Sequence, residues 1–154
     1  MADNTLKWSA YGSTKAALFA AGGLKNVATA AFAVSASAVD NTAGFQYADL
    51  ELLIDLATAA TAGGYVSIWW VPAIDATNYE TIVAGTITPA RPADAIIPVI
   101  STTTDAMVHT LCGIRWPQGV FKVLVQNNTG QTTTNTDNLT QLSFRAYSDN
   151  LVTA

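Results

Sequence analysis

Hydrophobic and polar side chains alternate along much of the chain, a pattern typical of β-strands. Residues 49–57 place Leu50, Leu52, Ile54 and Leu56 at every second position, with mainly acidic residues between them. Residues 120–126 and 139–147 alternate in the same way, and residues 65–71 are rich in aromatic and β-branched side chains. A period of two puts successive side chains on opposite faces of a strand. These segments therefore predict four strands, three of them buried on one face only.

Turn residues separate these strands and favour an all-β fold. Glycines at 63–64 predict a tight connection, whereas residues 72–95 and 127–138 read as loops. Further strands are expected at 95–101, where Pro98 favours an edge or a bulge, and at 107–114. Residues 24–39 alternate loosely and predict a strand pair. Six to eight strands without a long helix predict a single-domain, antiparallel, jelly-roll-like β-sandwich.

The N-terminal part of the chain has a different character. Residues 15–21 are rich in alanine, which favours a helix, and residues 1–23 as a whole are poorly patterned. We therefore predict a β-sandwich over residues 24–154 and an N-terminal arm over residues 1–23 that becomes ordered only on assembly. Deleting residues 2–22 is then expected to leave the fold intact.

Composition and charge exclude several classes of function. Only 12% of the residues are charged, about half the usual share, so the exterior is expected to be neutral and suited to packing against other subunits. The net charge is −4 and the seven basic residues are scattered, which argues against nucleic-acid binding. We expect no membrane span, because no run of 18 apolar residues occurs, and no signal peptide. A single cysteine, Cys112, fits synthesis in a reducing cytoplasm.

Candidate catalytic and metal-binding residues are few. His109 and Cys112 stand three positions apart and so face opposite sides of a strand, where they cannot chelate together. Asp49, Glu51 and Asp55 line one strand face, but a solvated or subunit-facing stripe explains them better than a pair of catalytic carboxylates. We therefore expect no catalytic residues, no cofactor and no metal, and predict that the chain is not an enzyme.

The dipeptide Trp69-Trp70 is unusual, because neighbouring strand residues face opposite ways. One tryptophan can enter the core, while the other needs a partner such as another subunit, a sugar ring or a neighbouring loop. The favoured interpretation is an interface with other subunits, formed by these tryptophans and by apolar residues of the N-terminal arm. Its candidate residues are Trp69, Trp70, Trp8, Tyr11, Leu18 and Phe19.

Several strand and turn segments resemble those of small structural proteins of tailed bacteriophages. The segments are Tyr47-Ala48-Asp49-Leu50-Glu51-Leu52, residues 71–79, residues 111–114, residues 117–122 and residues 125–131, and the resemblance spans roughly residues 24–147. It implies a jelly-roll decoration, or cement, protein that binds the outside of a capsid, often as a trimer. The expected partner is the major capsid protein or another virion protein, and the expected location is the capsid exterior after synthesis in the host cytoplasm.

Two alternatives to a decoration protein remain open. The same kind of sandwich could serve as a tail, baseplate or head-fibre subunit, because no motif separates these virion parts. A jelly-roll carbohydrate-binding module is the alternative from another class, since such modules carry aromatic platforms.

Overall fold

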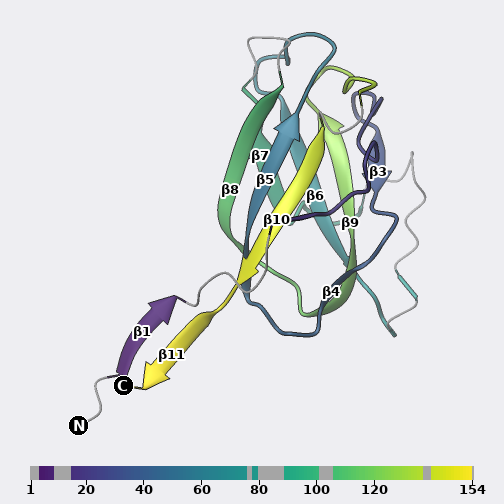
Figure 1. Ribbon diagram of the computed structural model, residues 1–154. Coiled ribbons are helices and arrows are strands. Elements are labelled where there is room, and N and C mark those ends of the chain that lie inside the picture. Colours follow the sequence, from purple (N-terminus) through teal and green to yellow (C-terminus); the bar gives the residue numbers. More distant parts are fainter. Residues whose placement is uncertain are drawn as a thin grey trace.

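The computed structural model describes residues 4–8, 15–75, 78–79, 89–100, 106–136 and 140–153, with only the backbone described for 4–8 and 149–153. Every regular element in these ranges is a β-strand (Figure 1). The strands are β1 (Asn4–Trp8), β2 (Ala16–Ala17), β3 (Phe32–Val34), β4 (Val39–Asn41), β5 (Tyr47–Ile54), β6 (Tyr65–Pro72), β7 (Ala95–Pro98), β8 (Met107–Arg115), β9 (Gly119–Asn128), β10 (Gln141–Tyr147) and β11 (Asp149–Thr153).

Two antiparallel sheets form the body of the molecule. The first has the order β2-β10-β5-β8, and the second has the order β3-β9-β6-β7. Strand β4 also pairs with β9, further along the same edge as β3, so β3 and β4 act as one interrupted strand. Along the chain the strands alternate between the sheets except at β6 and β7, which are neighbours in one sheet. Eight strand positions in this order make a jelly roll, and the predicted antiparallel sandwich is confirmed.

The hydrophobic core lies between the two sheets and follows the alternation of the sequence. In β5, Leu50, Leu52 and Ile54 are buried, while the intervening positions are half-buried. The facing sheet contributes Ile68 and Trp70 from β6, together with further buried residues of β7 and β9, to the same cluster. The period-two pattern therefore identifies the inward side chains of β5 correctly.

The beginning of the sandwich lies earlier in the chain than residue 24. Strand β2 pairs with β10, and Leu18 and Phe19 directly after it are buried in the core. The predicted boundary after residue 23 is therefore wrong, and residues 16–17 form a strand although the alanine-rich sequence favours a helix. Deleting residues 2–22 would remove an edge strand and two core side chains, so the structure predicts that this deletion destabilises the fold.

Strands β1 and β11 form a separate two-stranded antiparallel sheet, called here the terminal ribbon. Its register runs from Asn4 opposite Thr153 to Trp8 opposite Asp149. The terminal ribbon extends from the end of β10 away from the sandwich (Figure 1). The sequence analysis predicted neither strand.

The second sheet also buries its outer face at the centre. Trp69 and Val71 of β6 and Leu124 of β9 form a second buried cluster. Half-buried side chains pack around this outer cluster, and they belong to Phe32, Val34, Tyr79 and Ala93. Strand β6 is thus covered on both faces, which accounts for its nearly continuous apolar sequence.

The polar loop after β9 is held by hydrogen bonds from buried hydroxyl groups. Thr129, Thr133 and Thr140 are buried although the loop contains almost no apolar residue. The Thr133 hydroxyl accepts a hydrogen bond from the Val27 amide at 2.8 Å and donates one to the Leu24 carbonyl at 2.7 Å. This side chain therefore ties the loop to the segment between β2 and β3.

Replacing Thr133 by valine tests this tie, because valine keeps the shape of the side chain and removes the hydroxyl. We expect Thr133→Val to lower the free energy of unfolding by about 1–3 kcal/mol, since two buried backbone groups lose their partner. The neighbouring exposed Thr132 is the matched control, and Thr132→Val should change the free energy by less than about 0.5 kcal/mol. Urea denaturation followed by tryptophan fluorescence measures both; equal values for the two variants would contradict the assignment.

Candidate functional site

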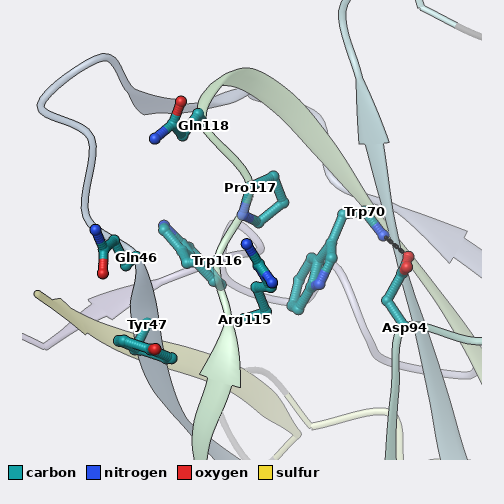
Figure 2. Close-up of a pocket in the computed structure, with 8 residues that line it drawn as sticks. All are labelled: Gln46, Tyr47, Trp70, Asp94, Arg115, Trp116, Pro117 and Gln118. Atoms are coloured by element: carbon teal, nitrogen blue, oxygen red, sulfur yellow. Dashed lines mark hydrogen bonds between the residues drawn. The ribbon is translucent and has the colours of Figure 1, made fainter.

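A cavity of about 660 Å³ opens at one end of the sandwich and is called here the end cavity. Its walls come from the start of β5, the middle of β6, the residue before β7, the end of β8 and the turn between β8 and β9 (Figure 2). The lining residues are Gln46, Tyr47, Trp70, Asp94, Arg115, Trp116, Pro117 and Gln118. Segments far apart in the sequence therefore meet at this site.

The turn between β8 and β9 is fixed by a buried asparagine. The side-chain amide of Asn41 donates hydrogen bonds to the carbonyls of Pro117, at 2.6 Å, and Phe45, at 2.8 Å. The Trp116 amide donates to the Gln46 carbonyl at 2.9 Å, and Gly119 ends the turn with a φ of 80°. The wall of the end cavity is thus rigid because these hydrogen bonds join the turn to the loop before β5.

The two tryptophans of the end cavity are part of an aromatic cluster. Trp116 stacks on Phe144 with ring centroids 4.8 Å apart, and it meets Trp70 edge to face at 5.0 Å. Phe121 packs edge to face against both indoles. Both tryptophans are buried, so their rings form the wall of the cavity and offer no exposed platform.

The charged groups of the end cavity differ in how they are paired. The Asp94 carboxylate accepts a hydrogen bond from the Trp70 amide at 2.8 Å and forms an ion pair with Arg91 at 2.6 Å. Arg115 is exposed and has no ion pair with any residue that the structure describes. The end cavity thus contains a carboxylate paired with Arg91 and, among the described residues, a guanidinium without an ion pair.

Trp69 and Trp70 are both buried, with exposed fractions of 4% and 6%. One of them faces outward, as predicted, and of the three partners considered for it the structure shows a neighbouring loop. Trp69 lies on the outer face of β6 within the outer cluster, where its ring is 6.0 Å from that of Phe32 and its Nε1 donates to the Arg91 carbonyl at 3.2 Å. A neighbouring loop is therefore the partner, and these side chains have little surface left for another subunit.

The other predicted interface residues fall into two groups. Leu18 and Phe19 are buried in the main core and so do not present a contact surface. Trp8 lies at the end of β1, in the part of the chain for which only the backbone is described, and Tyr11 lies outside the described residues. The four candidates whose side chains the structure describes are thus buried within the chain, and the predictions for Trp8 and Tyr11 stay predictions.

The acidic stripe predicted on β5 is largely occupied by groups of the chain itself. Asp49 accepts hydrogen bonds from the Gly113 amide at 2.9 Å and the Tyr147 hydroxyl at 3.3 Å, and Glu51 forms an ion pair with Lys15. Asp55 departs from the prediction, because it follows the end of β5 and is buried. There its carboxylate accepts a hydrogen bond from the Thr134 hydroxyl at 2.8 Å.

His109 and Cys112 lie on opposite faces of β8, as their spacing predicts. Cys112 is exposed, whereas His109 is half-buried and its Nε2 is a buried atom without a hydrogen-bond partner among the described residues. Burial lowers the pKa of His109, because desolvation disfavours the charged imidazolium. Among the described residues no group of three or more His, Cys, Asp or Glu side chains could hold a metal ion.

The sequence analysis did not identify the end cavity. Trp116 and Pro117 were visible as a turn signal, but Gln46, Arg115 and Gln118 carry no motif. The one available signal was the position of Arg115 directly before a tryptophan and a turn, where a strand ends and its last side chain becomes accessible. This position identifies Arg115 as a cavity residue only when the pairing of the strands is known.

Replacing Trp69 tests whether its cover is provided by the chain itself. We expect Trp69→Ala to lower the free energy of unfolding by about 3–5 kcal/mol, as for other buried aromatic side chains. Ile74, which is 85% exposed, supplies the control, and Ile74→Ala should shift the value by less than about 0.5 kcal/mol. Chemical denaturation measures both. A Trp69→Ala protein as stable as the control variant would show that the outer cluster contributes little to the fold.

Comparison with known proteins gives no relative for this chain. No protein-family model, no curated protein and no solved structure matches it. No helix in the described residues is long and apolar enough to cross a membrane.

Proposed function

We propose that the chain is a non-enzymatic structural protein of a tailed-phage virion, a decoration protein that binds the outer capsid surface and stabilises the shell. The observation that carries this proposal is the terminal ribbon, which extends from the sandwich (Figure 1). The major capsid protein is the proposed partner, and the chain is made in the host cytoplasm before it joins the virion.

The terminal ribbon has the properties of a docking element. A two-stranded β-ribbon alone in water is marginally stable, so it gains most from contact with a neighbour. Among the described residues each of its strands has a partner on one side only, and the backbone groups of the other edge can pair with a strand of another protein. Strand addition at this ribbon would attach the sandwich to a shell without changing the sandwich itself.

Exposed apolar side chains on the body support self-association. Ile96 of β7 and Val108 of β8 are 51% and 57% exposed, and Ile100, shortly after β7, is 74% exposed. Strands β7 and β8 are edge strands of the two sheets and contact each other along one side of the sandwich. Exposed apolar residues on unpaired edges favour contact with further copies, and a trimer is the proposed state.

The chemistry of the polar groups supports a structural role. The carboxylates of Asp49, Glu51 and Asp94 already have hydrogen-bond or ion-pair partners within the chain. The segments that resemble phage structural proteins lie on β5, β8 and β9 and in the region after β6. These segments form part of the framework of the sandwich. This is expected if the small phage structural proteins that they resemble share that framework.

Such a protein stabilises a shell by mass action. A ligand that binds the assembled shell and not its separated subunits shifts the equilibrium toward the shell by RT ln(1 + [L]/Kd) at each site. Many weak sites acting together then give a large total free energy. No chemical step is needed for this function.

A tail, baseplate or head-fibre subunit is the closest alternative, and immunogold electron microscopy of whole virions distinguishes these locations. Label spread over the head supports a decoration protein, whereas label confined to the tail or to fibres contradicts it. A carbohydrate-binding module is less well supported, because the indole rings of Trp70 and Trp116 are packed within the aromatic cluster.

Removing β1 tests the role of the terminal ribbon. We expect deletion of residues 2–8 to weaken attachment to capsids prepared without the protein by at least about tenfold, or 1.4 kcal/mol, because β11 loses its partner. The melting temperature of the sandwich should not change, since the deletion ends before Lys15. Leu6→Val preserves a strand residue at the centre of the ribbon and should bind normally. Cosedimentation measures attachment, and undiminished binding of the deleted protein would contradict the docking role.

The mass of the protein in solution tests self-association. We expect light scattering on a sizing column to give three times the 16.1 kDa of one chain, because exposed apolar edges favour further copies. Ile96→Lys on β7 should reduce this mass to that of a monomer, whereas Ile74→Lys, outside the two edge strands, should not. A wild-type protein that is monomeric at all concentrations would contradict the proposed trimer.

A further inference from the structure

Arg115 is the starting point, because it is a cation at the end of β8 with no counter-ion among the described residues. Its side chain lines the end cavity, and in the view of Figure 2 it lies between the side chains of Trp116 and Trp70. A guanidinium offers five donor N–H groups in a planar fork that matches the two oxygens of a carboxylate. Arg115 lies at the end of β8, next to the rigid β8–β9 turn. This position limits the directions in which its side chain can point.

Other donors surround the same space. The Nε1 atoms of Trp70 and Trp116 donate no hydrogen bond within the described part of the chain. Among the described residues, His109 Nε2 is the buried side-chain nitrogen or oxygen that lacks a hydrogen-bond partner. The two indole nitrogens also lack a partner but do not share that burial, so each is partly accessible. Gln46 and Gln118 contribute side-chain amides to the wall. Indole nitrogens can only donate, and amides can donate, so the cavity is rich in donors.

The carboxylate in the wall does not offset this excess of donors. Asp94 already accepts from the Trp70 amide, and its charge is compensated by Arg91. The uncompensated charge of the end cavity is therefore the single positive charge of Arg115. A ligand with one carboxylate satisfies both the charge and the open donors.

We infer that the end cavity binds the side-chain carboxylate of an aspartate or glutamate presented by a partner polypeptide. A volume of about 660 Å³ holds an acidic side chain with its neighbouring residues and lies in the usual range of ligand sites. A polypeptide fits better than a sugar, because Trp116 stacks on Phe144 and Tyr47 stacks on Tyr147, which leaves no open aromatic platform. A phosphate is disfavoured, since one guanidinium is a poor match for two charges.

This inference does not depend on the proposed function, because the residues that line the end cavity belong to the sandwich and none of them belongs to the terminal ribbon. It adds a second point of contact, with defined chemistry, to whatever partner the protein has. Failure of the carboxylate site would leave the docking of the ribbon untouched, and the two can be tested separately.

The test uses the indole N–H signals of the full-length protein in two-dimensional ¹H–¹⁵N NMR at constant ionic strength. The probe is the capped peptide acetyl-Gly-Glu-Gly-amide, and the matched control peptide carries Gln in place of Glu. We expect the Glu peptide to shift the assigned signals of Trp70 and Trp116. The signal of Trp69 should stay in place as an internal reference, because its Nε1 donates to the Arg91 carbonyl.

Substitution of the guanidinium completes the test. Arg115→Gln should weaken binding of the Glu peptide by about tenfold or more, the usual effect of losing a charge-assisted hydrogen bond. Arg145→Gln, on the same sheet but outside the end cavity, should bind as the wild type does. Thermal unfolding should show that both variants are folded.

Three results would overturn the inference. The first is the absence of any shift with the Glu peptide at saturating concentrations of the probe. The second is an equal response to the Glu and Gln peptides, or equal binding by the wild type and Arg115→Gln. The third is a shift of the Trp70 and Trp116 signals by glucuronate but not by the Glu peptide, which would identify an acidic saccharide as the ligand.

Discussion

The pairing of β6 with β9 is the interaction on which the rest of the structure depends. The two strands run antiparallel over eight residues at the centre of the second sheet, from Tyr65 opposite Asn128 to Pro72 opposite Phe121. Apolar side chains on both faces of this pair must be covered. The first sheet covers the inner face, and the outer cluster around Trp69 covers the other. The segment that precedes β7 is therefore part of the fold, because without it Trp69 would be exposed.

The alternation of apolar and polar residues correctly predicted those strands that bury one face in the core. Strand β5 alternates because one of its faces meets the core, and β9 and β10 follow similar logic. The same reasoning failed for residues 15–24 and for the terminal ribbon, because these segments are fixed by partners more than a hundred residues away. Alanines 16 and 17 favour a helix locally, yet pairing with β10 makes them a strand, since tertiary contacts outweigh helix propensity.

The candidate site was harder to predict than the fold for a related reason. Adjacent strand residues do face opposite ways, so the argument from Trp69 and Trp70 was right about direction. It could not say which partner covers the outward side chain, since Arg91, which accepts from Trp69 Nε1, and Tyr79 and Ala93, which pack against the outer cluster, lie in a stretch read only as loop. The end cavity combines residues from four separate segments of the sequence, and no spacing within one segment reveals it. Only the register of the sheets places Arg115 beside the two buried tryptophans.

The chain has few charged residues, so a polar or charged group without an internal partner indicates where another molecule could bind. Most polar groups described above are satisfied within the chain, as in the threonine-rich loop held by Thr133 and the turn held by Asn41. A surface of this kind has little to distinguish one partner from another, because neutral polar groups hydrogen-bond equally well to water. Specific recognition then has to come from groups that lack an internal partner. In the described part of the chain two such elements are the open edges of the terminal ribbon, which can pair with a strand, and Arg115, which can pair with one carboxylate. Backbone pairing supplies attachment with little selectivity, whereas a charge pair discriminates between partners, so the two elements together suit a protein that must attach to one kind of surface.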